Sequence, residues 1–212
     1  MSTTDLFEAA APVIQAVNEI TGEVTNVAIL DDKGYITMLL REESKHPLRH
    51  VVHVGSISLA YAHATGKALL SALTDKEIDR LYPEENLRPL TGKTVPTKAE
   101  LKKELQNVRN SGVAFNSEQA YEGVEAVASV IRNASGNVIA ATAISAPMVR
   151  INEEKRKRFA SLVKIGAGLI SYRLGYQDKA QLVHKVEDLY IWWQQNQRDD
   201  ISQAEIDTHI RA

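Results

Sequence analysis

The sequence predicts an α+β domain in which helices pack against an antiparallel or mixed sheet. Turn residues join neighbouring strand candidates directly in two places, one near each end of the predicted domain, and such hairpins pair their strands antiparallel. Helical segments lie before, between and after these two groups of strand candidates. A doubly wound parallel sheet would instead need strands that alternate regularly with helices, so the sequence excludes that class.

The chain begins with a predicted helix. Apolar residues between Leu6 and Ile20 recur every three or four positions, which is the period of one helix face. Thr4 or Asp5 can cap the start of this helix, and Gly22 can end it.

Three predicted strands follow the first helix. Residues 24–30 and 35–40 are rich in apolar and β-branched side chains, and they flank residues 31–34, which contain two aspartates and a glycine. This arrangement is typical of a β-hairpin. A third strand is predicted at residues 49–54, where Gly55 ends it.

Helices dominate the middle of the chain. Residues 64–73 form one predicted helix, and Thr74 and Thr97 each begin a capping-box pattern for another. The proline-containing residues 83–96 are predicted to be a loop, and Gly112 ends the last of these helices.

A second hairpin and a long helix complete the predicted domain. Residues 124–131 and 138–145 are strand candidates joined by a turn that contains Asn, Ser and Gly. Asn152 can then cap a helix that runs to Leu174, with Gly175 as its stop.

Composition excludes several classes of protein. The chain has 212 residues, 44% of them hydrophobic and 25% charged, and a net charge of −2, so as a whole it is not a nucleic-acid-binding surface. The charged residues 153–158 form i, i+4 pairs of opposite sign on one helix. The absence of cysteine excludes disulfides and a cysteine nucleophile. With no apolar run of about 20 residues and no signal-peptide pattern, we expect a cytoplasmic protein that does not contact membranes.

The motifs of common enzyme classes are missing as well. The sequence has no phosphate-binding Gly-x-x-x-x-Gly-Lys-Ser/Thr loop, no Gly-x-Ser-x-Gly elbow and no His-Glu-x-x-His pair. We therefore expect no catalytic residues and no cofactor.

Four of the six histidines are close together in the sequence: His46, His50, His53 and His63. Imidazole is a common metal ligand, so a metal site is one interpretation. In a strand, however, His50 and His53 would point to opposite faces, and no carboxylate lies nearby at a spacing typical of metal ligands. The favoured interpretation is two histidines at the surface and one or two in a pocket or the core, without a metal.

Residues 177–212 are predicted to be a helical extension of a domain that spans residues 1–176. The apolar side chains of the extension recur at helical spacing: Leu182, Val186, Leu189 and Trp193. This stripe can pack on its own domain, pair with another subunit or lie on a membrane, and the scarcity of basic residues beside it disfavours the membrane. A further capping-box pattern begins at Ser202.

Three stretches of the chain together resemble a known family. They are YAHATGKALL at residues 61–70, RNSGVAFNSE at residues 109–118 followed by EGV at residues 122–124, and AATAISAP at residues 140–147. In this order and spacing they resemble the effector-binding domain of IclR-type transcriptional regulators, over about residues 6–175. The resemblance implies a GAF-like α+β fold and a role in transcription regulation.

In that family a winged helix-turn-helix domain precedes this one and binds DNA. The resemblance therefore implies that DNA is contacted only through a domain that this sequence does not contain. Two alternatives stay open: an excised ligand-binding half of a regulator, or a regulator-like protein without a DNA-reading domain. A homodimer or homotetramer is expected.

The resemblance also implies a pocket for a small organic effector. The matching positions on this chain are Leu48, His50, Ser58, Ala64, Thr65, Asn116, Ala126, Ala143 and Ser145. Unpaired N–H groups at a helix N-terminus attract anions such as carboxylates, which agrees with a pocket at the start of the predicted helix 64–73.

Three of these positions depart from the family pattern. Members that sense small keto acids often have an acid where Asn116 lies, a cysteine where Ala126 lies and a serine where Ala143 lies. A pocket with fewer polar groups compensates poorly for desolvating a small, fully polar ligand. We therefore expect a larger effector that is partly apolar or aromatic and carries a carboxylate or an amide.

Other interpretations of the same residues stay open. The three alanines of the proposed pocket can be close-packing core residues, Thr65 can be the N-cap of its helix, and Asn116 can close a turn with Ser117. For the whole protein, the alternatives to a ligand sensor are a small-molecule enzyme on a GAF-like scaffold and an oligomerisation module that senses no ligand.

Overall fold

The computed structural model describes residues 3–178 and 182–196. Its centre is a six-stranded sheet in the order β3-β2-β1-β6-β5-β4, in which all neighbouring strands pair antiparallel. The predicted α+β class is therefore confirmed. The strands are β1 (Val24–Leu30), β2 (Tyr35–Glu42), β3 (Ile57–Leu59), β4 (Ala114–Ser117), β5 (Val124–Arg132) and β6 (Val138–Pro147).

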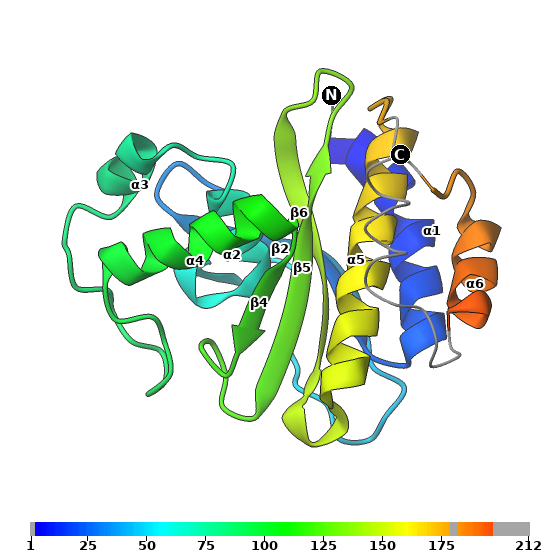
Figure 1. The fold of residues 1–212 in the computed structure, drawn as a ribbon, viewed down its shortest axis with the longest axis horizontal. Coiled ribbons are helices and arrows are strands. Elements are labelled where there is room, and N and C mark those ends of the chain that lie inside the picture. The colour runs from blue at the N-terminus through cyan, green and yellow to red at the C-terminus, as the bar shows by residue number, and fades with distance from the viewer. Residues whose placement is uncertain (1–2, 179–181, 197–212) are drawn as a thin grey trace.

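Helices cover both faces of the sheet (Figure 1). One face carries α1 (Thr3–Thr21) and α5 (Glu153–Arg173), with α6 (Val186–Gln195) packed on α1. The other face carries α2 (Ala64–Leu70), α3 (Asp75–Leu81) and α4 (Lys98–Ser111). Two 3₁₀ turns, η1 (Ala60–Ala62) and η2 (Met148–Arg150), precede α2 and α5. Within the described residues, no helix is long and apolar enough to cross a membrane.

The two faces of the sheet differ in the size of their core side chains. In β1, Val27 packs in the cluster that includes α1 and α5, whereas its neighbour Ala28 packs in the cluster that includes α2. The buried residues that β1, β5 and β6 contribute to the second cluster are all alanines: Ala28, Ala128, Ala141 and Ala143. Because alanine occupies little space, α2 can lie close to the sheet.

The strands at the two edges differ from the prediction. Residues 49–54 do not form a strand, and the edge strand is instead β3 at Ile57–Leu59. Val51 and Val54 are 59% and 60% exposed, so the valines of this segment do not form a buried sheet face. Strand β4 is not among the predicted strands, because four residues are too short for a clear strand pattern.

Most helix ends lie where the sequence predicts them. The side-chain oxygens of Thr74, Thr97 and Asn152 each accept a hydrogen bond from the third backbone N–H of the helix that follows. Helix α1 is an exception: it begins at Thr3, so Thr4 and Asp5 lie in its first turn and do not cap it.

The predicted C-terminal helix packs against its own domain. Leu189 of α6 is fully buried, and both tryptophans contact the cluster formed by α1, α5 and the sheet. The Tyr190 hydroxyl donates a hydrogen bond of 2.5 Å to Glu19 on α1. Of the alternatives for the apolar stripe, packing on the same chain is therefore the one observed, although Leu182 is 43% exposed. The capping-box pattern at Ser202 lies outside the described residues.

Candidate functional site

A pocket lies between the alanine-rich face of the sheet and the start of α2. The lining residues come from β1, β2, β4, β5 and β6, from the start of α2, and from the segments that follow β2 and β4 and precede α2. The space between atoms is about 480 Å³, part of it open to solvent, but water-molecule centres fit in only about 50 Å³. The pocket is therefore narrow, with room for a few waters or a small ligand.

Seven of the nine predicted site residues line this pocket: His50, Ala64, Thr65, Asn116, Ala126, Ala143 and Ser145. Leu48 does not, because its side chain is 61% exposed and its carbonyl accepts a hydrogen bond of 2.9 Å from Arg150. Ser58 is not a lining residue either, but its Oγ lies 2.8 Å from Nε2 of His63, which is one. The role of these residues in ligand binding stays a prediction.

The structure also bears on the other interpretations of these residues. Thr65 is not an N-cap, because α2 begins at Ala64 and His63 precedes it as the cap. The Asn116 amide donates to the carbonyl of Ala62 and accepts a hydrogen bond of 3.0 Å from the Gln119 backbone. Asn116 thus closes a turn, with Gln119 rather than with Ser117. The three pocket alanines also pack in or against the core on that face.

Sequence reasoning missed three polar residues of the pocket: Asn26, Arg41 and Tyr121. His50 and His63 both line it, as the expectation of one or two histidines in a pocket or the core allows. Asn26 is 5% exposed although it lies in the middle of β1. A polar residue within a strand that is buried on both faces is a usable signal, since most such groups need a specific partner. Arg41 carried no such signal, because an arginine near the end of a hairpin strand resembles an ordinary surface residue.

Both pocket histidines are neutral near pH 7. Burial lowers the pKa of His50 to about 4, and the positive charge of Arg41 lowers it further. Burial also lowers the pKa of His63 to about 4, with smaller effects from His50 and Lys67. The two rings lie 5.8 Å and 5.7 Å from the Tyr121 ring. Among the described residues, no group of three His, Cys, Asp or Glu side chains is arranged to hold a metal ion.

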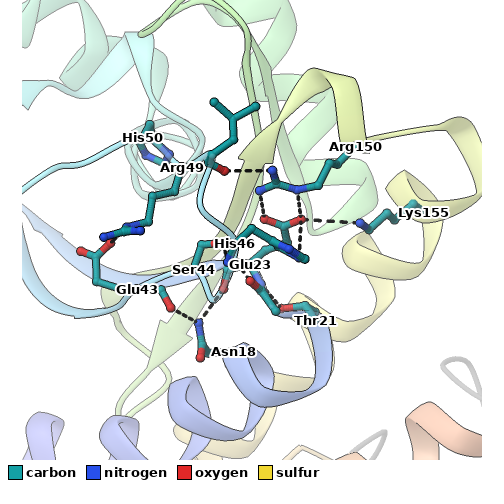
Figure 2. A network of polar contacts seen from close by, with 12 residues as sticks. Asn18, Thr21, Glu23, Glu43, Ser44, His46, Arg49, His50, Arg150 and Lys155 are labelled. Atoms are coloured by element: carbon teal, nitrogen blue, oxygen red, sulfur yellow. Dashed lines mark hydrogen bonds and ion pairs between the residues drawn. The ribbon is translucent and has the colours of Figure 1, made fainter.

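The buried carboxylate of Glu23 and its partner Arg150 hold the segment between β2 and β3 against the end of α1. Glu23, between α1 and β1, has no exposed surface. Arg150 donates two hydrogen bonds to its carboxylate, at 2.7 Å and 2.6 Å, and Lys155 and His46 lie 3.6 Å and 3.9 Å from it. Figure 2 shows these three side chains converging on Glu23. Because Arg150 also donates to the Leu48 carbonyl, it connects the α1–β1 junction and the segment after β2 to η2, the turn before α5.

Gly66 sets how closely α2 approaches the turn before it. A Cβ atom at this position would lie 2.0 Å from the carbonyl oxygen of Ala60, which is backbone and cannot rotate away. Gly66→Ala is therefore expected to lower the free energy of unfolding by about 2–3 kcal/mol through overpacking, as measured by urea denaturation. Gly92→Ala is the matched control, because a Cβ there meets nothing within 4 Å. Equal stability of the two variants would contradict the close contact.

Comparisons with known proteins identify relatives for most of the chain. A family model described as the C-terminal domain of the bacterial transcriptional regulator IclR matches residues 1–172. The HTH-type transcriptional repressor AllR of Salmonella typhimurium is 31% identical over 171 residues, which are 81% of this chain and 62% of the repressor. The chain thus spans about three fifths of the length of the curated relatives that it matches.

Solved structures agree with these sequence matches. IclR of Thermotoga maritima superposes with a TM-score of 0.75 at 26% identity, over 81% of this chain and 69% of that one. The C-terminal domain of the Escherichia coli transcriptional regulator KdgR superposes with a TM-score of 0.73 at 25% identity, over 81% of this chain and 99% of that one. The antiparallel sheet and its two helical layers are therefore the architecture of that C-terminal domain.

Proposed function

The chain belongs to the IclR family of bacterial transcriptional regulators, and from this premise we propose that it binds a small organic effector in the pocket beside α2. The observation that carries the proposal is the pocket itself, which brings together residues from five strands, the start of α2 and the connecting segments. Enclosed sites with a few converging polar groups among apolar walls are typical of small-molecule binding. Seven residues that the family resemblance assigns to an effector site line the same cavity.

The effector acts as a signal and is not a substrate. The proposal that the domain is non-catalytic is supported by the relatives, which are named as transcriptional repressors or regulators. DNA is contacted by a separate domain of the regulator, and the effector changes how subunits of a homo-oligomer are arranged. Such coupling requires the effector to bind one arrangement more tightly than the other.

A thermal-shift screen of small organic acids and amides tests the proposal. At least one compound is expected to raise the melting temperature, because a ligand that binds only the folded state stabilises it. Ala126→Leu, which places a larger side chain in the pocket wall, is expected to abolish that rise. Recovery of the unchanged compound after incubation distinguishes a sensor from an enzyme, since turnover would contradict the non-catalytic role. A rise of equal size in Ala126→Leu would place binding elsewhere.

The mass of the protein in solution tests self-association. We expect light scattering to give a dimer or tetramer, since the proposed signal is a rearrangement of subunits. A monomer at all concentrations would contradict that part of the proposal while leaving effector binding intact.

A further inference from the structure

We propose that Arg41 anchors the effector through a carboxylate, and that the effector is a monoanion with a hydroxyl, amine or amide N–H beside that carboxylate. This inference rests on the proposed effector pocket and specifies the chemistry that the pocket recognises. Four buried polar atoms, one formal charge and the register of three strands support it.

Unpartnered polar atoms are concentrated in the pocket. Five buried side-chain polar atoms lack a hydrogen-bond partner in the described part of the chain, and four of them belong to pocket residues: Asn26 Oδ1, Arg41 Nη1, His50 Nδ1 and Ser145 Oγ. Native proteins pair more than about nine in ten buried polar groups, because each unpaired one is costly. Four such atoms around one cavity therefore indicate groups that a ligand satisfies.

The guanidinium of Arg41 is held in a fixed orientation. Its Nε donates to Glu43 at 2.8 Å, and its Nη2 donates to the His50 carbonyl at 2.8 Å. The side chain is only 3% exposed, and Nη1 is the atom without a partner. Because two of the three nitrogens are already bound, Arg41 presents its third nitrogen without having to reorganise. A preoriented donor of this kind loses little conformational entropy when it binds an anion.

The charge balance of the lining favours one negative charge on the ligand. Arg41 lines the pocket, and no aspartate or glutamate does. The carboxylate that pairs with Arg41, Glu43, lies outside the lining and is 49% exposed, so solvent weakens its compensation of the Arg41 charge. Burial lowers the pKa of His50 and of His63 to about 4, so neither adds a positive charge near pH 7. A second carboxylate on the ligand would find no cation to pair with in this lining, and burying an unpaired charge is strongly unfavourable.

Strand register places an acceptor next to the proposed anchor. Asn26 pairs directly with Arg41 across β1 and β2, and with Ala143 across β1 and β6. Directly paired residues have Cβ atoms about 5 Å apart. The unpartnered oxygen of Asn26 requires a hydrogen-bond donor from the ligand. A hydroxyl or N–H group close to the carboxylate meets this requirement, and Ser145, two residues further along β6, can donate or accept.

Matched acids and amides test the proposed anchor. Isothermal titration would compare lactate with lactamide and mandelate with mandelamide, so that each pair differs only at the carboxylate. We expect at least one acid to bind the wild-type protein about 10- to 100-fold more tightly than its amide, the range for a hydrogen bond to a charged group. Arg41→Gln is expected to remove that preference. Propionate and phenylacetate, which lack the hydroxyl, are expected to bind more weakly than lactate and mandelate.

Two further variants separate recognition from folding. Asn26→Asp keeps the shape and the acceptor oxygen of the side chain but adds a negative charge beside Arg41. We therefore expect it to weaken the binding of the acids and to leave the binding of the amides unchanged. Arg49→Gln is the matched control, because Arg49 lies 3.6 Å from the same Glu43 but does not line the pocket; acid binding should be unchanged.

The outcomes distinguish this inference from the proposed function. If each acid binds the wild type no more tightly than its amide, or if Asn26→Asp leaves the binding of the acids unchanged, the anionic anchor is wrong although the pocket still binds ligands. If none of these compounds binds at 10 mM, the proposed ligand class is overturned, and the wider thermal-shift screen decides separately whether the pocket binds any effector.

Discussion

Arg150→Met is expected to lower the free energy of unfolding by about 3–5 kcal/mol, the usual cost of removing one partner from a buried ion pair. Glu23 is fully buried, and Arg150 supplies both of its short contacts, at 2.7 Å and 2.6 Å. After the substitution, Lys155 at 3.6 Å and His46 at 3.9 Å remain, and neither is within direct hydrogen-bond distance. The Glu23 carboxylate would then be buried without adequate compensation. Urea denaturation measures the loss.

A charged residue on the neighbouring helix provides the control. Lys157 lies 3.9 Å from Glu153, and both side chains are about two-thirds exposed, so Lys157→Met should change stability by at most about 0.5 kcal/mol. Glu23→Gln with Arg150→Met should recover part of the loss, because the double variant has no unpaired carboxylate. If Arg150→Met cost no more than Lys157→Met, the buried ion pair would not hold these segments together.

The regular elements of the fold were predictable from the sequence, whereas the irregular segment between β2 and β3 was not. Hairpins, helix caps and the α+β class follow from local patterns, and the structure has them at nearly the expected residues. The irregular segment between β2 and β3 does not follow, because distant groups hold it. Arg150 and Asn18 donate to carbonyls of this segment from 102 and 25 residues away. No local pattern encodes such contacts.

The pocket, too, was predictable from the sequence only in part. Its residues on α2, β4 and β6 lie within the stretches that resemble the family, whereas Asn26 and Arg41 lie outside them on β1 and β2. The bulge between Val27 and Ala28 shifts the register so that Arg41, and not Leu40, lies opposite Asn26. Sequence alternation alone cannot locate a bulge. The expectation of a weakly polar pocket is consequently incomplete, because β1 and β2 supply an arginine and an amide.

The second large effect that we expect is a loss of stability as the pH falls from 6.5 to about 4. The pKa of His63 is about 4 in the folded protein, lowered by burial and then by His50 and Lys67. An unfolded histidine titrates near 6.5. Between these pH values the histidine is protonated in the unfolded chain but not in the folded protein, so the free energy of unfolding falls as the pH falls. For His63 this difference in pKa corresponds to a loss of about 3 kcal/mol in the free energy of unfolding. Burial, and then Arg41, lower the pKa of His50 to about 4 as well, so about 3 kcal/mol is the upper limit for that residue.

The difference between variants isolates this effect from the carboxylates that titrate in the same range. His63→Gln keeps a polar partner for Ser58 but cannot be protonated, so its stability should decline less steeply than that of the wild type below pH 6.5. The two curves should run parallel again below about pH 4, where the folded histidine is also protonated. His53→Gln, at an exposed position, should follow the wild type throughout. Parallel curves for His63→Gln and the wild type from pH 6.5 to 4 would mean that His63 is protonated as readily in the folded protein as in the unfolded chain, and its burial beside His50 and Lys67 would then not exclude charge from the pocket.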